Sequence, residues 1–222
     1  MSLVKKQCEF GEQLEQRKTP ISCLRTELII YRSNLKESLG AKTYALPSPV
    51  WIVGTYDEDG RPNMMTAAWG GICCSRPPCV YVSLREATYS HGSILNRRAY
   101  TVSIPGEEYW KEADYIGIAS GRDTDKFKDT KLTPIKSEVI DAPYNEEFPL
   151  VIECKLKEIV DLGLHTMFVG EIIDVKAEQD VLSSGRPDIQ KVKPLLFNSG
   201  DRGYHRVDSR MGDAFSIKLP PY

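Results

Sequence analysis

Apolar and polar positions alternate in short runs over much of the chain, and this pattern predicts β-strands. Ile152, Cys154 and Leu156 alternate with charged residues, which is the period of a strand with one buried face. Further β-rich runs cover residues 50–55, 63–69, 79–84, 100–104 and 166–176. Asp59 and Gly60 separate the first two of these runs, and this dipeptide is typical of a hairpin because both residues tolerate positive φ.

Helical spacing occurs at four places. Over residues 24–39, apolar residues recur every three or four positions up to Gly40, which predicts an amphipathic helix in an N-terminal extension. Shorter helices are expected over residues 88–98, 107–119 and 123–129. In the first of these three, Ile94 and Leu95 are expected to face inward. The second has one apolar face, formed by Tyr109, Ala113 and Ile116.

Six or more strands, a hairpin at the start and a few inserted helices predict a mainly β fold. Strands and helices do not alternate regularly, so an antiparallel barrel with helical insertions is favoured over a parallel, doubly wound sheet. The chain has no Gly-x-Gly-x-x-Gly turn and no Gly-Lys-Ser/Thr loop. The usual dinucleotide and phosphate-loop motifs are therefore excluded.

Composition changes this picture little. The 222 residues include 29 Lys and Arg against 31 Asp and Glu, so the net charge of -2 gives no reason to expect nucleic acid or an anionic membrane as a partner. No apolar run approaches the roughly 20 residues of a membrane-spanning helix. The first residues lack the apolar core and cleavage site of a secretory signal. We expect a cytoplasmic protein.

The six cysteines predict no metal site, because they form neither a Cys-x-x-Cys pair nor a Cys/His cluster with zinc spacing. In the cytoplasm we expect all six to be reduced. Cys79 and Cys154 lie in apolar runs and are expected to be small core residues. A redox-active Cys73/Cys74 pair is the alternative, although a disulfide between adjacent residues is strained.

Three segments carry small polar residues where a phosphate and a flat heterocycle could bind: residues 63–71, 83–90 and 163–165. The second places an arginine and three hydroxyl groups at a strand end and a helix start, which is a ready anion site. Taken singly, each segment also fits ordinary structure. Strand packing, a helix cap with a solvated arginine, and a turn histidine at position 165 are the corresponding alternatives.

Several ordered blocks resemble the flavin reductase-like family, and within it the flavoredoxins. The blocks are residues 49–55, 59–63, 65–69, 77–78, 82–85, 88, 121–127, 163–165 and 168–171. The resemblance implies a split β-barrel that binds FMN, with FAD a less favoured choice, and that forms a homodimer. It implies these cofactor-binding residues: Asn63, Met65, Thr66, Ala67, Ala68, Trp69, Ser83, Leu84, Arg85, Thr88, Tyr89, Ser90, Lys126 and Phe127.

The resemblance also assigns two roles and a domain plan. Arg85 is the expected counter-charge of the FMN phosphate, and His165 is the expected catalytic residue, close to the flavin and the nicotinamide. Residues 1–38 form a partly helical extension and residues 39–190 the FMN-binding domain. Residues 191–222 are expected to form a tail that wraps the barrel or a dimer partner.

Two functions are favoured over a flavin-binding module without turnover and a barrel that binds no flavin and makes protein contacts. In the first, NAD(P)H reduces bound FMN, which passes electrons to a small acceptor such as free flavin. In the second, the chain is an electron carrier reduced by a protein donor, without NAD(P)H activity of its own. Residues 107–147 hold eleven acidic and six basic side chains, which fit either a docking patch for a redox partner or a solvated surface.

Overall fold

The computed structural model describes residues 36–216. The chain divides into two compact units, Met1–Thr43 and Tyr44–Tyr222, of which the second contains all the regular structure described here. Most of the helix predicted over residues 24–39 lies outside the described residues. Residues 36–39 are described and are not helical. No helix in the described part of the chain has the length and apolar character needed to cross a membrane.

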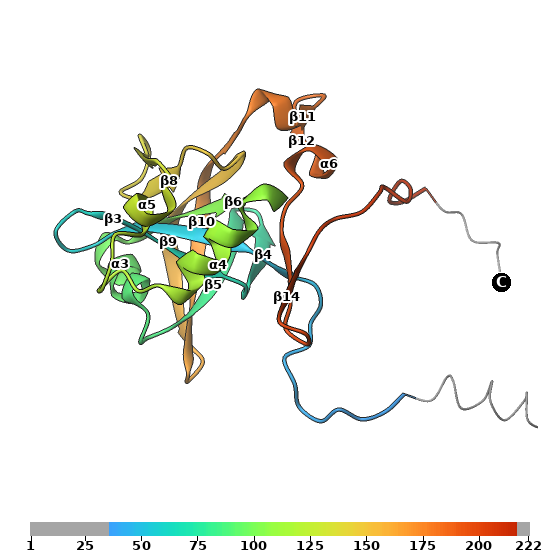
Figure 1. The fold of residues 1–222 in the computed structure, drawn as a ribbon, viewed down its shortest axis with the longest axis horizontal. Helices are drawn as coiled ribbons and strands as arrows, with labels where there is room; N and C mark the ends of the chain where they lie inside the picture. The colour runs from blue at the N-terminus through green and yellow to red at the C-terminus, as the bar shows by residue number, and fades with distance from the viewer. Residues whose placement is uncertain (1–35, 217–222) are drawn as a thin grey trace, which may run out of the picture. The chain divides into compact units, whose positions relative to one another are not determined.

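A seven-stranded sheet dominates the second unit (Figure 1), and every strand pairing in the described residues is antiparallel. In spatial order its strands are β3 (Pro62–Ala67), β2 (Trp51–Tyr56), β6 (Ala99–Ile104), β9 (Leu150–Asp161), β10 (His165–Ala177), β5 (Pro78–Arg85) and β4 (Gly70–Ser75). The prediction of a mainly β, antiparallel fold is confirmed.

The predicted hairpin between the first two runs is also confirmed, since β2 pairs with β3 in antiparallel register. The Asp57 carboxylate accepts a hydrogen bond from the backbone N–H of Arg61 at 2.8 Å, which closes the turn. Gly60 adopts a φ of +79°, a conformation that few other residues reach without strain. Asp57 and Gly60 therefore fix the register of the strands that lead to the candidate site.

The strand β4 was not predicted, because the expected strands cover residues 63–69 and 79–84 and leave residues 70–78 between them unassigned. Gly70 explains why a strand passes here. A Cβ atom at Gly70 would lie 2.4 Å from the Trp51 ring and 2.9 Å from the Tyr81 carbonyl oxygen, so only glycine lets the strand approach so closely. The preceding strand β3 ends at Ala67, so Trp69 lies in the link between two strands and not within the second strand as expected.

The three helices predicted after residue 87 are present with shifted ends: α3 (Tyr89–Arg97), α4 (Trp110–Ile118), preceded by the short turn η1 (Glu107–Tyr109), and α5 (Lys126–Thr130). Ile94 is buried as predicted, but Leu95 is exposed, so its predicted inward position is wrong. Ser90, His91 and Ser93 complete the buried face of α3, and Leu95 follows Ile94 by about 100° around the helix, on the solvent side.

Short elements complete the second unit: β1 (Ser48–Pro49), β7 (Pro134–Lys136), β8 (Pro143–Asn145), η2 (Gln179–Val181), β11 (Leu182–Ser183), β12 (Arg186–Pro187), α6 (Ile189–Val192), β13 (Leu196–Asn198) and β14 (Gly203–His205). A small sheet joins β13 to both β1 and β14. Tyr204 on β14 donates a hydrogen bond to Asp114 on α4 at 3.0 Å. The C-terminal strands therefore pack on the body that carries the candidate site.

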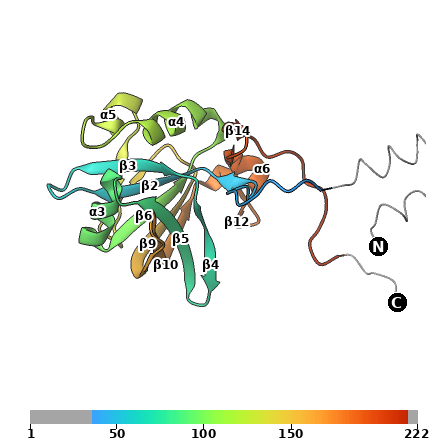
Figure 2. The same ribbon diagram turned by 90° about the horizontal axis from the view of Figure 1, so that it is seen from below.

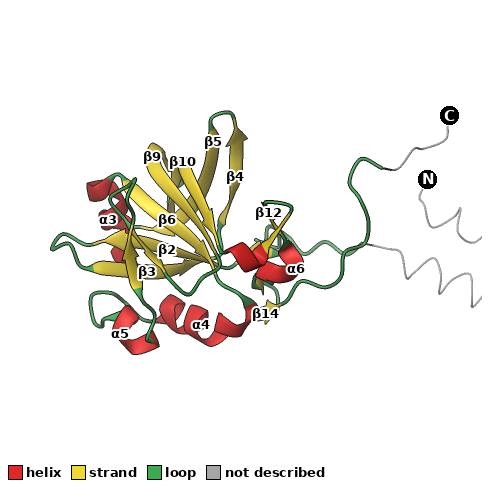
Figure 3. Cartoon of the chain, turned by 90° about the horizontal axis from the view of Figure 1, so that it is seen from above, coloured by secondary structure: helices red, strands yellow, loops and turns green. Residues whose placement is uncertain are grey.

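Two apolar cores hold the sheet and helices together. One lies inside the barrel, where Ile94 of α3 packs with residues such as Val82, Tyr100 and Phe168. The other lies between β2, β3 and the helices α4 and α5, which Figures 2 and 3 show side by side along these strands. Each fully buried large apolar side chain contributes about 1.5–3 kcal/mol to folding. The edge strand β3 is thus covered on both of its faces.

Candidate functional site

Three sequence-predicted segments meet where β5 ends and β10 begins. His165 is the register partner of Arg85, and Met167 is that of Ser83. The backbone N–H of Ser83 donates to the carbonyl oxygen of Trp69 at 2.8 Å, which brings the β3–β4 link to the same place. Residues separated by about 100 positions in the sequence therefore form one surface.

The aromatic pair on this surface is Trp69 and His165. Their ring centroids lie 4.8 Å apart with an angle of 15° between the ring planes, so the two rings are stacked. Trp69 is 42% exposed, although it is a large aromatic residue. A half-exposed tryptophan beside a histidine and an arginine offers a flat apolar surface with polar groups at its edge. Such a surface fits a flat, polar-edged heterocycle.

The turn between β5 and α3 lies next to this aromatic pair. The backbone N–H and the hydroxyl group of Thr88 both donate to the carbonyl oxygen of Arg85, at 2.9 and 2.8 Å. Thr88 is the N-cap of α3, yet its side chain accepts no capping hydrogen bond, and the first turn of α3 holds no acidic residue. The free N–H groups of a helix N-terminus attract anions, so this turn suits a phosphate group.

Two arginines flank this turn. Arg85 is exposed at the end of β5, where the sequence predicted a counter-charge. Arg122, which was not predicted as a site residue, donates to the carbonyl oxygen of Ala87 at 2.9 Å and lies 5.6 Å above the Tyr89 ring. Its signal was in the sequence, because residues 121–127 form one of the blocks that resemble the family. A second cation therefore stands over the turn.

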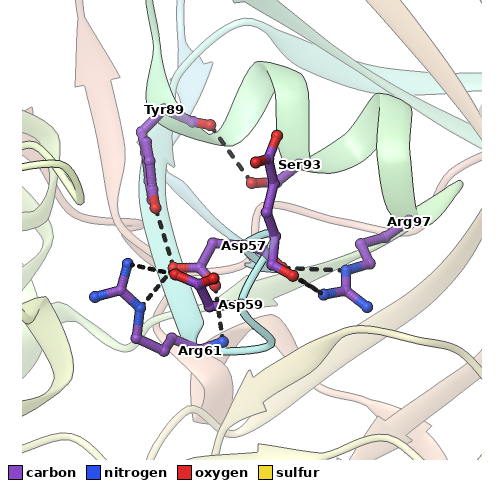
Figure 4. Close-up of polar contacts among 7 residues, drawn as sticks. Asp57, Asp59, Arg61, Tyr89, Ser93 and Arg97 are labelled. Atoms are coloured by element: carbon purple, nitrogen blue, oxygen red, sulfur yellow. Dashed lines mark hydrogen bonds and ion pairs between the residues drawn. The ribbon is translucent and has the colours of Figure 1, made fainter.

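The Tyr89 hydroxyl group is hydrogen-bonded to the Asp57 side chain, as Figure 4 shows. The hydroxyl group donates to the Asp57 carboxylate at 3.0 Å, and the Arg61 guanidinium donates to the same carboxylate at 2.9 Å. Burial alone would raise the pKa of Asp57, but hydrogen bonds from Arg61 and Tyr89 together hold it below the usual value. Burial, and then Asp57, raises the pKa of Tyr89, so the hydroxyl group keeps its proton.

Arg97, the last residue of α3, supports the β2–β3 turn that carries Asp57. Its guanidinium group donates to the backbone carbonyl oxygens of Asp57 and Glu58. Asp57, Arg61 and Arg97 were not predicted as site residues. Their connection to Tyr89 depends on tertiary contact between the β2–β3 turn and α3, and the spacing of residues in the sequence gives no sign of it.

A polar cavity of about 310 Å³ opens beside Tyr89 and extends to α5. Its lining includes Arg61, Asn63, Arg122 and Lys126 together with the acidic residues Asp57, Asp123 and Asp125. The backbone of Gly121 lies close to the Asn63 and Tyr89 side chains in the cavity wall. A Cβ atom at this position would lie 2.3 Å from the Asn63 side chain and 2.5 Å from the Tyr89 ring. Glycine at this position lets the loop after α4 close against β3 and α3.

Asn63 and Ser90 are buried and bonded to each other. The Asn63 side-chain amide donates to the Ser90 hydroxyl oxygen at 2.9 Å, which ties β3 to the first turn of α3. Both residues were predicted to bind a cofactor, and in this structure their side chains position the α3 N-terminus. A buried polar pair of this kind fixes the position of the helix relative to the strand.

Lys126, Phe127 and Thr66 lie on the face of β3 that α4 and α5 cover. The Lys126 ammonium group donates to the carbonyl oxygens of Met64 and Ile116, both at 2.9 Å. Burial lowers the pKa of Lys126 to about 8. The Thr66 hydroxyl group donates to the Ala113 carbonyl oxygen at 2.5 Å, and Phe127 belongs to the second core. These side chains connect the helices to β3.

The remaining predicted residues are mostly apolar. Ala67 and Leu84 are buried in the barrel core, Met65 packs against it, and Ala68 is half-buried in the link before Trp69. Any polar contact that they make to a ligand would come from their backbone groups.

His91 was not predicted as a site residue, although it lies in the first turn of α3. Its Nε2 atom lies 2.9 Å from the Thr166 hydroxyl oxygen, and its ring meets the edge of Phe168 at 5.0 Å. Burial lowers the pKa of His91. Because Thr166 follows His165 directly, this contact ties the α3 N-terminus to the strand that carries the catalytic candidate.

Comparisons with known proteins agree with this arrangement. The profile of the family described as "Flavin reductase like domain" matches residues 43–207. The structure of flavoredoxin from Desulfovibrio vulgaris (Miyazaki F) superposes with a TM-score of 0.79 and 51% identity, over 82% of this chain and 98% of that one.

Two further relatives are more distant. The FMN-binding protein of Thermus thermophilus superposes with a TM-score of 0.68 and 25% identity, over 81% of this chain and 99% of that one. The reductase component of a 4-nitrophenol monooxygenase from Rhodococcus opacus is 28% identical over 59% of this chain and 66% of its own length.

Proposed function

Because this chain belongs to the flavin reductase-like domain family, we propose that it binds FMN and transfers electrons through it. The observation that carries the proposal is the meeting of Trp69, His165 and the β5–α3 turn at one surface. Support also comes from the relatives, since one is named an FMN-binding protein and another a reductase component.

The donor set of this surface fits FMN. The first turn of α3 offers N–H groups without a competing acidic residue, and Arg85 and Arg122 supply positive charge for a phosphate that carries close to two negative charges. Trp69 and His165 offer a flat wall for the isoalloxazine ring. Bound FMN would supply the redox chemistry, while the chain binds, orients and tunes it.

In this proposal His165 is the catalytic residue. It stands at the start of β10, beside Arg85, with one ring face against Trp69. From there its ring nitrogens can donate a hydrogen bond toward negative charge at the flavin edge and help to orient a nicotinamide. His165→Ala should slow reduction while FMN stays bound. His205→Ala is the matched control, because His205 is an exposed histidine on β14. Equal reduction rates in both variants would contradict the role of His165.

The proposed electron donor is NAD(P)H, and the proposed acceptor is a small molecule such as free flavin. The test is the visible spectrum of the FMN-loaded chain, recorded anaerobically before and after adding NADH or NADPH. Bleaching of the flavin band within seconds is expected. If no flavin band develops after FMN is added, the chain is not a flavoprotein and the proposal fails.

One observation favours a second function, an electron carrier without NAD(P)H activity. Asp123, Asp125 and Asp129 are exposed beside the polar cavity, where they could dock a redox protein with a basic surface. In the same experiment, a flavin band that persists with NADH and NADPH but bleaches with a reduced redox protein would favour this function.

We also propose that the chain works as a homodimer in the cytoplasm. Ile159, Leu162 and Leu164 are exposed around the end of the long β9–β10 hairpin, which gives an apolar surface for a second copy. The proposed cytoplasmic location would keep the four free cysteines of the described chain reduced. Light scattering that gives the mass of one chain at micromolar concentration would contradict the dimer.

A further inference from the structure

Three cysteines lie near one another in the register of the β4–β5 hairpin, away from the proposed flavin surface. Cys74 on β4 is the direct cross-strand partner of Cys79 on β5. Directly opposed residues of antiparallel strands have Cα atoms about 4.5–5.5 Å apart, and disulfides span about 4.4–6.8 Å between Cα atoms. The register therefore places the Cα atoms of these two residues within the range that a disulfide spans.

A bulge adds the third thiol. Ile72 pairs with Val80 and Cys74 pairs with Cys79, so Cys73 is the extra residue of β4. In a bulge, two residues of one strand oppose one residue of the other. Because β4 is the edge strand of the sheet, it can shift without breaking a ladder on its outer side.

The thiols differ in exposure, which sets an order of reaction. Cys73 and Cys74 are exposed, whereas Cys79 is buried and its thiol donates to the Pro77 carbonyl oxygen at 3.4 Å. Burial raises the pKa of Cys79, and the neighbouring Cys74 and Cys73 raise it further. An incoming molecule therefore meets the exposed thiols of Cys73 and Cys74 before the buried Cys79, and of these two Cys74 is the direct cross-strand partner of Cys79.

We propose that Cys74 and Cys79 form a second redox site, a dithiol that reduces low-molecular-weight disulfides. The Cys74 thiolate attacks one sulfur of the small disulfide, so a mixed disulfide forms and one small thiol leaves. Cys79 then loses its proton and attacks the Cys74 sulfur, which releases the second small thiol and leaves a Cys74–Cys79 disulfide. The protein dithiol is oxidised by two electrons and the small disulfide is reduced by two.

This site is separate from the proposed flavin surface. Cys79 and Ser83 are four residues apart on β5, which corresponds to roughly 13 Å along an extended strand. Its test can therefore be made without FMN, and its failure would leave the flavin proposal untouched.

The test uses the full chain, oxidised glutathione and alkylation of the remaining thiols, followed by mass spectrometry of the peptide that carries residues 73–79. The wild type should show a Cys74–Cys79 link with Cys73 alkylated and no glutathione attached. Cys73→Ser is the matched control and should form the same link. Cys79→Ser should retain glutathione on Cys74, because the second step is blocked.

Three results would overturn the proposal. These are a Cys73–Cys74 link in the wild type, glutathione that stays attached in the wild type as it does in Cys79→Ser, and full alkylation of all three cysteines after treatment. The peptide maps of the wild type and Cys73→Ser decide the matter even if Cys79→Ser does not fold, since both keep the buried thiol.

Discussion

The predicted cofactor residues on and around β3 form two regions that use polar groups differently. Where α4 and α5 cover the strand, Lys126 and Thr66 donate to backbone carbonyl oxygens inside the protein, and Phe127 fills a core. Next to the β5–α3 turn, Trp69 in the β3–β4 link and Arg85 at the end of β5 remain exposed. The first region holds the helices in place, and the second has groups available for a ligand. A residue in a family motif can thus support the site through contacts inside the protein, whether or not it also touches a ligand.

The largest expected effect comes from Phe127→Ala, which opens a hole in the second core. Loss of a buried phenylalanine costs about 3–5 kcal/mol of unfolding free energy. Leu95→Ala is the control on the exposed face of α3 and should cost less than about 0.5 kcal/mol. Denaturant unfolding measures both. If Phe127→Ala weakened FMN binding without lowering stability, Phe127 would belong to the ligand region.

Lys126 should make the unfolding free energy of the chain rise with pH in the alkaline range. Its pKa is about 8 in the folded chain and about 10.5 when unfolded, so between these values the unfolded state binds more protons and stability rises with pH. The gain approaches about 3 kcal/mol by pH 10.5. Lys126→Met should lack this gain in stability. The change in unfolding free energy between pH 7 and pH 10, compared between the wild type and Lys126→Met, gives the contribution of Lys126. Parallel pH curves for the two proteins would contradict the buried position of the ammonium group.

Trp69→Ala should weaken FMN binding by roughly tenfold, because an aromatic stacking contact contributes about 0.5–1.5 kcal/mol beyond its buried area. Its effect on stability should be small, since the side chain is half-exposed. Trp110→Ala is the matched control: Trp110 is similarly exposed, at 46%, but lies on α4. Titration with FMN, followed by flavin fluorescence, compares them. If Trp69→Ala and Trp110→Ala bind FMN with equal affinity, the isoalloxazine ring does not stack on Trp69.

An effect on stability smaller than those at Phe127 and Lys126 is expected for Tyr89→Phe, which removes the hydrogen bond to Asp57 and keeps the ring under Arg122. The expected loss is about 1–2 kcal/mol of unfolding free energy at neutral pH. The Tyr89 hydroxyl lowers the pKa of Asp57, so this contribution is present above pH 4 and disappears as the pH falls through the lowered pKa. Tyr115→Phe, at an exposed contact with Asp129, is the control. A loss that does not diminish as the pH falls below 4 would contradict this link.

The sequence was sufficient for the parts of the fold with clear periodicity. Strands β2, β5, β6, β9 and β10 follow apolar runs, and the Asp59-Gly60 turn sets the first hairpin. β4 was missed because its two glycines and exposed residues show no alternation, and its position depends on close approach to Trp51. β7 and β8 have three residues each, too few to show a period.

The candidate site could be predicted only in part, for a similar reason. The segments around Trp69, Ser83 and His165 were identified from their residues, but their meeting depends on the β5–β10 register. Arg122 and Asp57 reach the site through loops that pack on α3, and the local sequence pattern does not predict those contacts. The role of Lys126 also depends on which face of β3 the helix α5 covers.

The most direct test of the central claim compares FMN with riboflavin, which lacks the phosphate group, in the wild type, in Arg122→Ala and in Arg85→Ala. Arg186 lies on β12 and supplies the control variant Arg186→Ala. We predict that the wild type binds FMN more tightly than riboflavin, and that both site variants reduce this preference about tenfold or more while riboflavin affinity stays unchanged. If the preference survives in both variants, the phosphate does not bind at the β5–α3 turn and the proposed site is wrong.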